Sequence, residues 1–277
     1  MLKIFVSSAF IFSLAISLHA QVKMPAPSST QTIKQDFALG SIELTYSRPN
    51  AKDRKIYGDL VPYNKIWRTG ANAATRIRFS DPVEIGGKKF DSGTYVIYTM
   101  PGIDNWTIIF NKGINNWGTE GYKETEDVIR FKTEPAKLKN KLETFTMQFT
   151  DIKPESCELH IIWAKTDIRI AITANIKERL RTQIETALQS DKKPYWQAAQ
   201  FYNEYDNNKT KALDNCNKAI MDNPKAYWIY LYKAKIQKDL ADNSGAIQSS
   251  KKSLELAKEE KNDDYIKMNE ALLKELK

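Results

Sequence analysis

Basic and aromatic residues that could bind a ligand gather between Tyr46 and Thr75, where the alternation of apolar and polar residues breaks off. This pattern indicates a loop, and loops held on a rigid β scaffold commonly carry binding groups. An arginine presents a planar fork of five donors that fits a carboxylate, phosphate or sulfate. An indole can stack on a sugar face or an aromatic ring. The candidate ligand-binding residues are Arg48, Arg54, Trp67, Arg68 and Asn72, with Lys112 and Trp117 farther along the chain.

The same residue types also have structural uses, and the sequence leaves both roles open. The arginines can bond loop carbonyls or pair with Asp53, Asp59 and Asp127, and the tryptophans can fill a core. If the side chains converge on a cavity instead, they suit a small anionic or saccharide ligand.

Histidine-based catalysis has little support. His19 lies in the N-terminal leader discussed below, so the mature chain retains His160 alone. Because His160 alternates with Leu159 and Ile161 in an apolar run, we expect it to pack beside a strand. A metal site built from several histidines is excluded, and a Ser-His-Asp or Cys-His mechanism would depend on this one residue. No metal or cofactor is predicted.

Paired carboxylates offer the alternative, a carbohydrate-active hydrolase, because glycoside hydrolysis needs two acids flanking the scissile bond. The available acids are also typical of solvated loops, and the sequence has neither a glycine-rich phosphate loop nor a nucleophile elbow. We therefore expect binding rather than catalysis. The candidate acids are Asp53, Asp59, Glu120, Glu124, Glu126 and Asp127.

Residues 1–20 have the features of a secretory signal peptide. Lys3 precedes an apolar stretch from Ile4 to Leu18, and Ala20 provides a small residue before a cleavage site at Gln21. The apolar stretch is shorter than the roughly 20 residues of a membrane span, although an uncleaved anchor is the alternative. No cysteine follows that could carry a lipid. We expect an exported protein, periplasmic or secreted, with no membrane span after cleavage.

Composition places the chain among soluble globular proteins, with 42% hydrophobic and 27% charged residues. The formal charge of +8 is spread along the chain, with no basic run longer than two. A nucleic-acid footprint would be clustered, so no nucleic-acid partner is expected. Cys157 and Cys216 have no CxxC neighbour, which excludes a structural zinc site, and we expect both to be small buried side chains. A disulfide between them would have to join a strand to a helix.

From Gln31 to about Thr173 the apolar residues recur with the period of two that predicts β-strands. Gly86 and Gly87 suit a two-residue hairpin turn because both can adopt positive φ. The stretches GTYVIYTM and NWTIIFN are apolar on both faces, as central strands are. Nine to eleven short strands with tight turns predict an antiparallel all-β sandwich or barrel.

After Thr173 the period becomes helical, and ten of the eleven glycines lie at or before Gly121. Ile176 begins a run of apolar residues spaced by four that ends at Leu188, with Asn175 available as an N-cap. Two similar segments follow. The two segments resemble tetratricopeptide repeats, with a period near 34, in Trp196, Ala212, Ala219 and Pro224 and again in Trp228, Leu231 and Ala246.

The repeats depart from that pattern in Cys216, Ser250 and Ser253, where larger or apolar residues are usual. Two repeats are few for independent stability, so we expect the helix after residue 174 and a capping helix to complete the stack. The tryptophans fit inter-helix packing as well as ligand contact, and the stack as a whole suits docking of a protein or peptide. The expected capping helix places Tyr265, Met268, Leu272 and Leu276 on one face.

Three blocks carry a family resemblance: YSRPNAKDRKIYGDLVPYNKIWRTGANAATRIRFS, GTYVIYTMPGIDNWTIIFNKGINNWG and EDVIRFK. Over about residues 22–173 the chain resembles the domain-of-unknown-function family 2911, found mostly in proteins exported from Bacteroidetes-type bacteria. The family usually has Gly where Asp53 stands. The resemblance implies an exported all-β domain, sometimes followed by tetratricopeptide-like repeats, and no established activity, so no catalytic residue carries over.

The expected organisation is a signal peptide at 1–20, an all-β domain at 21–173 and helical repeats at 174–277. The expected function is that of an exported binding and interaction protein.

Overall fold

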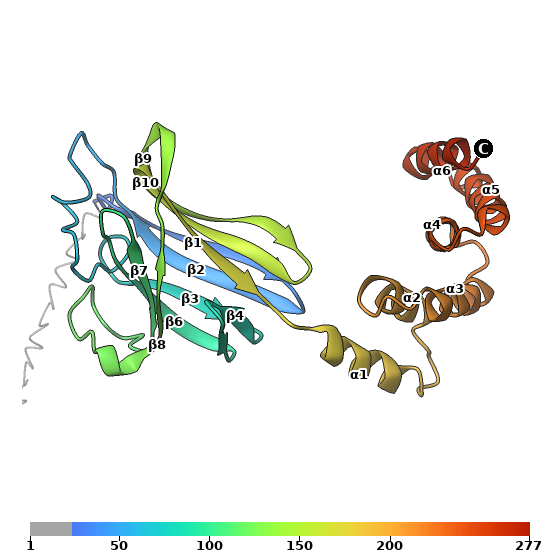
Figure 1. Ribbon diagram of the computed structural model, residues 1–277, viewed down its shortest axis with the longest axis horizontal. Helices are drawn as coiled ribbons and strands as arrows, with labels where there is room; N and C mark the ends of the chain where they lie inside the picture. Colours follow the sequence, from blue (N-terminus) through green and yellow to red (C-terminus); the bar gives the residue numbers. More distant parts are fainter. Residues whose placement is uncertain (1–23) are drawn as a thin grey trace, which may run out of the picture.

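The computed structural model describes residues 24–277, and the leader expected at residues 1–20 lies outside this range. Ten strands are followed by six helices, which lie beyond one end of the strands (Figure 1). The strands are β1 (Ser29–Phe37), β2 (Gly40–Arg48), β3 (Thr75–Phe79), β4 (Val83–Ile85), β5 (Lys88–Phe90), β6 (Gly93–Met100), β7 (Trp106–Asn111), β8 (Asp127–Thr133), β9 (Ala136–Lys153) and β10 (Ser156–Thr173). The helices are the 3₁₀ turn η1 (Glu124–Glu126) and α1 (Lys177–Ala187), α2 (Tyr195–Glu204), α3 (Lys209–Asp222), α4 (Tyr227–Asp239), α5 (Asn243–Glu259) and α6 (Asp263–Glu275).

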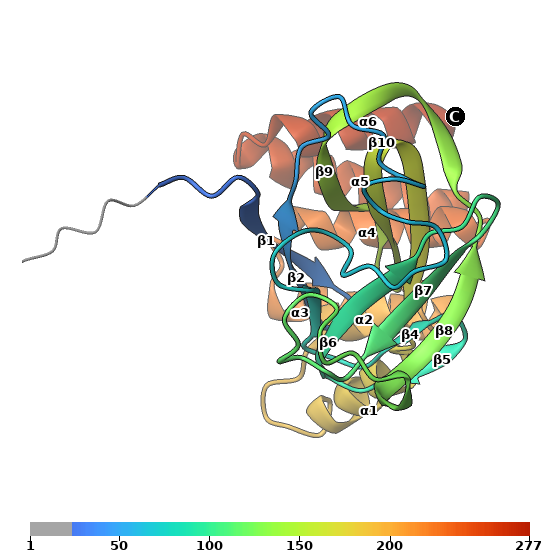
Figure 2. The ribbon, with the colours of Figure 1, turned by 90° about the vertical axis from the view of Figure 1, so that its left-hand side faces the viewer.

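The strands form two antiparallel sheets, ordered β1-β2-β3-β6-β7-β8 and β5-β4-β10-β9. A single apolar core draws residues from both sheets, which confirms the predicted all-β sandwich. The expected central strands β6 and β7 lie inside the larger sheet, and Gly86 and Gly87 form the β4–β5 turn with φ of +57° and +77°. Figure 2 views the sandwich from its loop end, with the helices behind it.

The centre of the core is a cluster of aromatic rings. Trp67 stacks on Trp163 with ring centroids 6.1 Å apart, and it meets Trp106, Phe145 and Tyr57 edge to face. Edge-to-face contacts place the positive ring edge on the negative ring face, which makes such clusters stable and directional. The loop that begins at Trp67 is thereby anchored in the sandwich.

Strand β10 folds back on itself. His160 Nδ1 lies 2.9 Å from Asp167 Oδ1, although residues seven apart in an extended strand would be roughly 23 Å apart. The reversal falls at Ala164, which has φ of +52° and sits between two register shifts. The second half of β10 then pairs with β4 and leads to the helices.

Helix α1 connects the sandwich to the other helices. The expected N-cap at Asn175 is wrong: Ile176 occupies the cap position and its N–H donates to Glu155 Oε1 at 3.0 Å. The first turn of α1 is therefore capped by the β9–β10 turn rather than by a local side chain. Arg179 of α1 also pairs with Asp81 at 2.6 Å.

The remaining helices pack as the pairs α2–α3 and α4–α5, with α6 against α5. The serines that depart from the repeat pattern have a role here. Ser250 Oγ donates to Asn269 Oδ1 at 2.9 Å, and Asn269 Nδ2 donates to Ser253 Oγ at 2.8 Å. Small hydroxyl side chains on α5 thus hold α6 through one buried asparagine. Within residues 24–277 no helix is long and apolar enough to span a membrane.

Candidate functional site

Arg48 closes the exposed edge of β9. Its Nε donates to the carbonyl of Phe145 at 3.2 Å and its Nη2 donates to Thr146 Oγ1 at 3.0 Å. Beside it, the Tyr46 hydroxyl accepts from the N–H of Met147 at 2.9 Å, and its single proton lies within reach of Gln31 Oε1 at 2.8 Å and of the Met147 carbonyl at 3.1 Å. Unpaired strand edges recruit other chains, so these two side chains satisfy backbone groups that would otherwise be free.

Arg54 bonds its own loop. Its guanidinium donates to the carbonyls of Ala51 at 2.9 Å and Asn50 at 2.7 Å. The neighbouring Asp53 adopts φ of +56°, a left-handed conformation that favours glycine, which fits the family's usual Gly at this position. Asp53 points outward and lies 3.7 Å from Lys141. Arg54 therefore stabilises the turn and is not available to a ligand in this conformation.

Trp67 and Arg68 point to opposite sides of the chain. Trp67 is 9% exposed and belongs to the core, where its Nε1 donates to the carbonyl of Gly70. Arg68 therefore faces the outer surface of the six-stranded sheet. Its Nε is buried without a hydrogen-bond partner, and its guanidinium makes no hydrogen bond or ion pair within residues 24–277.

A tightly bonded loop holds Arg68 in place. The carbonyl of Arg68 accepts from Thr75 N at 3.2 Å, and Thr75 Oγ1 donates to the carbonyl of Thr69 at 2.5 Å. Thr69 and Asn72 both have positive φ, which is unusual for a β-branched residue such as threonine. Asn72 spans the loop and the sheet, since its Nδ2 lies 3.2 Å from the carbonyl of Ser28 and 3.4 Å from Ser47 Oγ.

Trp117 and Gly118 lie in the loop after β7, and Gly118 contacts Arg68. A Cβ built on Gly118 would lie 3.3 Å from Arg68 Nη1 and 3.8 Å from the carbonyl oxygen of Asn72. The adjacent Trp117 is 65% exposed, although most indoles are largely buried. Of the seven predicted residues, Arg68 thus lies against Gly118 with its side chain and Asn72 with its backbone carbonyl alone, and Trp117 is the preceding residue in the chain.

A bonded network beneath this loop keeps it in position. The Tyr98 hydroxyl donates to the carbonyl of Gly118 at 3.1 Å, and the Tyr122 hydroxyl donates to Asp127 Oδ2 at 2.8 Å. Burial raises the pKa of Tyr122 to about 12, so its hydroxyl remains a neutral donor. Asp127 also accepts from Asn111 Nδ2 at 2.7 Å and from Arg130.

Lys112 lies apart from the Arg68 cluster. It borders a hollow of about 250 Å³ that is also lined by Glu126 and Asp127, and these two are the only candidate acids that share one of the described hollows. Both oxygens of Asp127 already accept hydrogen bonds, as described above. Asp59 and Glu120 are exposed, and Glu124 pairs with Arg130 at 3.2 Å. Among the six candidate acids in the described part of the chain, the one pair that shares a hollow, Glu126 and Asp127, includes a carboxylate whose two oxygens already accept hydrogen bonds.

His160 lies on the outer face of β10, away from Arg68, and is 8% exposed. Its Nδ1 faces both oxygens of Asp167, at 2.9 and 3.1 Å. Its Nε2 makes no hydrogen bond among residues 24–277, although Glu158 Oε2 lies 3.4 Å away. The pairing with Asp167 depends on the fold-back of β10, which the apolar alternation around His160 did not reveal.

The candidate binding residues predicted from the sequence did not include Arg76 and Arg78. Arg76 and Arg78 alternate with the core residues Ile77 and Phe79 in β3, so both point outward, and both are exposed. Neither forms an ion pair in the described part of the chain. The signal was the period of two in TRIRF, which places successive arginines on one face.

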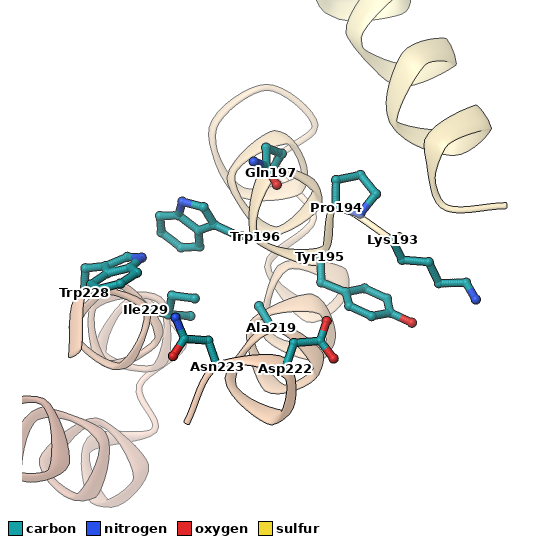
Figure 3. Close-up of a pocket in the computed structure, with 10 residues that line it drawn as sticks. All are labelled: Lys193, Pro194, Tyr195, Trp196, Gln197, Ala219, Asp222, Asn223, Trp228 and Ile229. Atoms are coloured by element: carbon teal, nitrogen blue, oxygen red, sulfur yellow. The ribbon is translucent and has the colours of Figure 1, made fainter. Parts of the chain in front are cut away.

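The helical part has its own hollow, of about 230 Å³, between α2, α3 and α4 (Figure 3). Trp196 and Trp228 lie on one side, with Tyr195 and Ile229 completing the apolar wall and Asn223 at the rim. Trp196 also packs edge to face on Tyr232 with ring centroids 4.9 Å apart, so it contributes to helix packing and to the hollow at once.

The chain is a two-part protein. It consists of a β sandwich with polar residues in its loops, followed by helices that pack in pairs. A family model described as "Protein of unknown function (DUF2911)" matches residues 28–172, which is more than half of the chain, and the chain belongs to this family. No curated protein and no solved structure matches the chain. The match covers the sandwich and brings no activity with it.

Proposed function

We propose that the chain is an exported, periplasmic or secreted, binding protein. Its β domain takes a small anionic or saccharide ligand at Arg68, and its helix pairs dock a protein or peptide partner. The observation that carries the proposal is the Arg68 guanidinium, which lies against Gly118, the residue that follows the exposed Trp117, and makes no hydrogen bond or ion pair within residues 24–277. An unpaired buried Nε is costly, and an anion bound to the guanidinium would offset that cost.

The chemistry of the site fits an acidic sugar. The guanidinium of Arg68 supplies a fork for a carboxylate or sulfate, and the Trp117 indole offers an apolar face for the ring. Arg48 and Arg54 do not add to the site, because loop carbonyls already hold them. The ligand is therefore bound by one arginine and one indole. Because only two side chains contact it, we expect modest affinity.

The test is calorimetric titration of the mature chain with glucuronic acid, galacturonic acid and sodium sulfate, with glucose as the neutral comparison. We expect an acidic probe to bind and Arg68→Gln or Trp117→Ala to abolish the signal without unfolding the chain. Lys251→Gln on α5 removes the same charge from an exposed position and is the matched control. Unchanged binding in both site variants would remove Arg68 from the proposal.

The partner site is tested separately. Asn223→Arg and Gln197→Arg place bulky side chains at the rim of the Trp196–Trp228 hollow and leave the packed aromatic rings in place. If the helix pairs dock a partner there, each variant lowers capture of that partner from periplasmic extract by the full chain, relative to Lys251→Gln. Equal capture by all three chains counts against docking at this hollow.

A further inference from the structure

Three arginines point outward from the six-stranded sheet and form what we call the arginine row: Arg76 and Arg78 on β3, and Arg68, whose backbone bonds the start of β3. The carbonyl of Arg68 accepts from Thr75 N at 3.2 Å, which places Arg68 beside the start of β3. Arg76 and Arg78 occupy the next two outward positions of β3, and successive outward positions on a strand are about 7 Å apart. The row therefore extends from the Arg68 site along the strand.

None of these three arginines forms an ion pair with a protein acid within residues 24–277. Arg130 on the same face, by contrast, is paired with Asp127 and Glu124. Glu43 lies opposite Arg78 in the pairing of β2 with β3 but makes no ion pair with it. Guanidinium groups without ion-pair partners along β3 give this face of the sheet a positive strip.

Neutral hydroxyl groups flank the row. Thr45 on β2 pairs with Arg76, and Thr32 on β1 pairs with Thr45, with their hydroxyl oxygens 3.0 Å apart. Thr32 is exposed and Thr45 is half-buried. Hydroxyl groups beside guanidinium groups match a chain that carries both hydroxyl and acid groups.

We propose that the ligand of the β domain is an extended acidic polysaccharide, bearing carboxylate or sulfate groups, that lies along β3 with one sugar on Trp117 and acid groups on Arg68, Arg76 and Arg78. This inference rests on the proposed function and specifies its ligand. A nucleic acid is the less suitable polyanion, because one exposed indole offers a single stacking platform and three arginines few phosphate contacts.

The experiment compares chain length. Oligogalacturonates of one to eight residues, dextran sulfate, neutral dextran and single-stranded DNA are titrated into the full mature chain at several salt concentrations. We expect affinity to rise with oligogalacturonate length, dextran sulfate to compete, and neutral dextran not to bind. Binding should weaken with salt, as contacts between opposite charges do.

The informative variant is Arg76→Gln/Arg78→Gln, since both side chains are exposed and make no hydrogen bond or ion pair within residues 24–277. We expect it to lower affinity for the longer chains about tenfold and to leave galacturonic acid binding unchanged. Lys251→Gln/Lys258→Gln on α5 removes the same charge elsewhere and should have no effect. Thermal unfolding checks that every variant is folded.

The outcomes separate the two proposals. If Arg68→Gln abolishes binding while Arg76→Gln/Arg78→Gln leaves chain binding intact, the ligand is small and the extended strip is wrong. If DNA binds as tightly as oligogalacturonate through the same residues, the assignment to a polysaccharide is wrong. If no acidic sugar of any length binds, the proposed function fails together with this inference.

Discussion

The backbone of Gly118 rests on the guanidinium of Arg68: a Cβ built on this glycine would lie 3.3 Å from Nη1 and 3.5 Å from Cδ of the arginine. Gly118 also has φ of +63°, in the left-handed region that glycine adopts without strain. The positive φ of Gly118 and its close contact with Arg68 together explain why the loop after β7 has a glycine at this position. The position of the Arg68 guanidinium in the proposed ligand site therefore depends on the backbone of Gly118.

Gly118→Ala tests this dependence. The left-handed conformation alone should cost about 1–2 kcal/mol in the free energy of unfolding, and the displacement of Arg68 should add to it and weaken acidic-sugar binding. Gly87→Ala is the matched control, because Gly87 has φ of +77° and no atom within 4 Å of its Cβ position. Urea denaturation compares the two variants. Equal destabilisation with unchanged binding in both would contradict a contact role for Gly118.

The sequence pattern was sufficient for the sandwich and insufficient for the site. Alternation of apolar and polar residues predicted the strands because it shows which residues lie on the buried face of a strand. This is a local property of the sequence. The hydrogen-bond partners of each arginine depend on residues far away in the sequence. Arg48 bonds Phe145 and Thr146, nearly a hundred residues along the chain. Arg68 has the same side chain and no such partner within residues 24–277, and no local pattern distinguishes the two.

The helical part shows the same limit. Helical spacing predicted the order of helices, but the N-cap of α1 is served by Glu155 from the sandwich rather than by Asn175. Similarly, Ser250 and Ser253 depart from the repeat pattern because both form hydrogen bonds with Asn269 of α6. Contacts between segments far apart in sequence decided each of these positions.

The two predicted tryptophans should respond in opposite ways to truncation. Trp67 is packed by four aromatic rings, so Trp67→Ala should lower the free energy of unfolding by about 3–5 kcal/mol. Trp117 is 65% exposed, so Trp117→Ala should change it by no more than about 0.5 kcal/mol while removing ligand binding. Denaturant titration and calorimetry on the same samples check both effects. A stability loss of similar size in Trp117→Ala would show that this indole is structural.

Tyr46→Phe should remove the hydrogen bond that the Tyr46 hydroxyl makes with the backbone of β9 at Met147. The variant leaves the buried N–H of Met147 without its hydroxyl partner, at a cost of about 1–3 kcal/mol in the free energy of unfolding. Tyr63→Phe serves as the control, since Tyr63 is exposed and its hydroxyl makes no hydrogen bond within residues 24–277. Amide hydrogen exchange at Met147 should accelerate in Tyr46→Phe alone. Exchange at the wild-type rate would mean that the N–H of Met147 is protected by something other than this hydroxyl.

The junction of α1 with α2 should weaken in acid. Arg181 grips Asp206 with two hydrogen bonds, Nη2 to Oδ1 at 2.5 Å and Nη1 to Oδ2 at 3.2 Å. These bonds hold the pKa of Asp206 below its ordinary value of 3.8, with a smaller contribution from Lys177. A carboxyl whose pKa is lowered by folding stabilises the fold above its ordinary pKa and loses that contribution as the pH falls through the folded-state pKa.

Asp206→Asn should therefore be less stable than the wild type at pH 7, and the gap should narrow as the pH falls below about 4. Acid effects from the other carboxylates are common to both chains, so the difference between their melting temperatures isolates Asp206. Asp214→Asn, which removes an exposed acid paired with Lys218 within α3, controls for net charge and should show a small gap at every pH. A gap for Asp206→Asn that stays constant down to pH 2.5 would mean that the ion pair with Arg181 does not fasten α1 to α2.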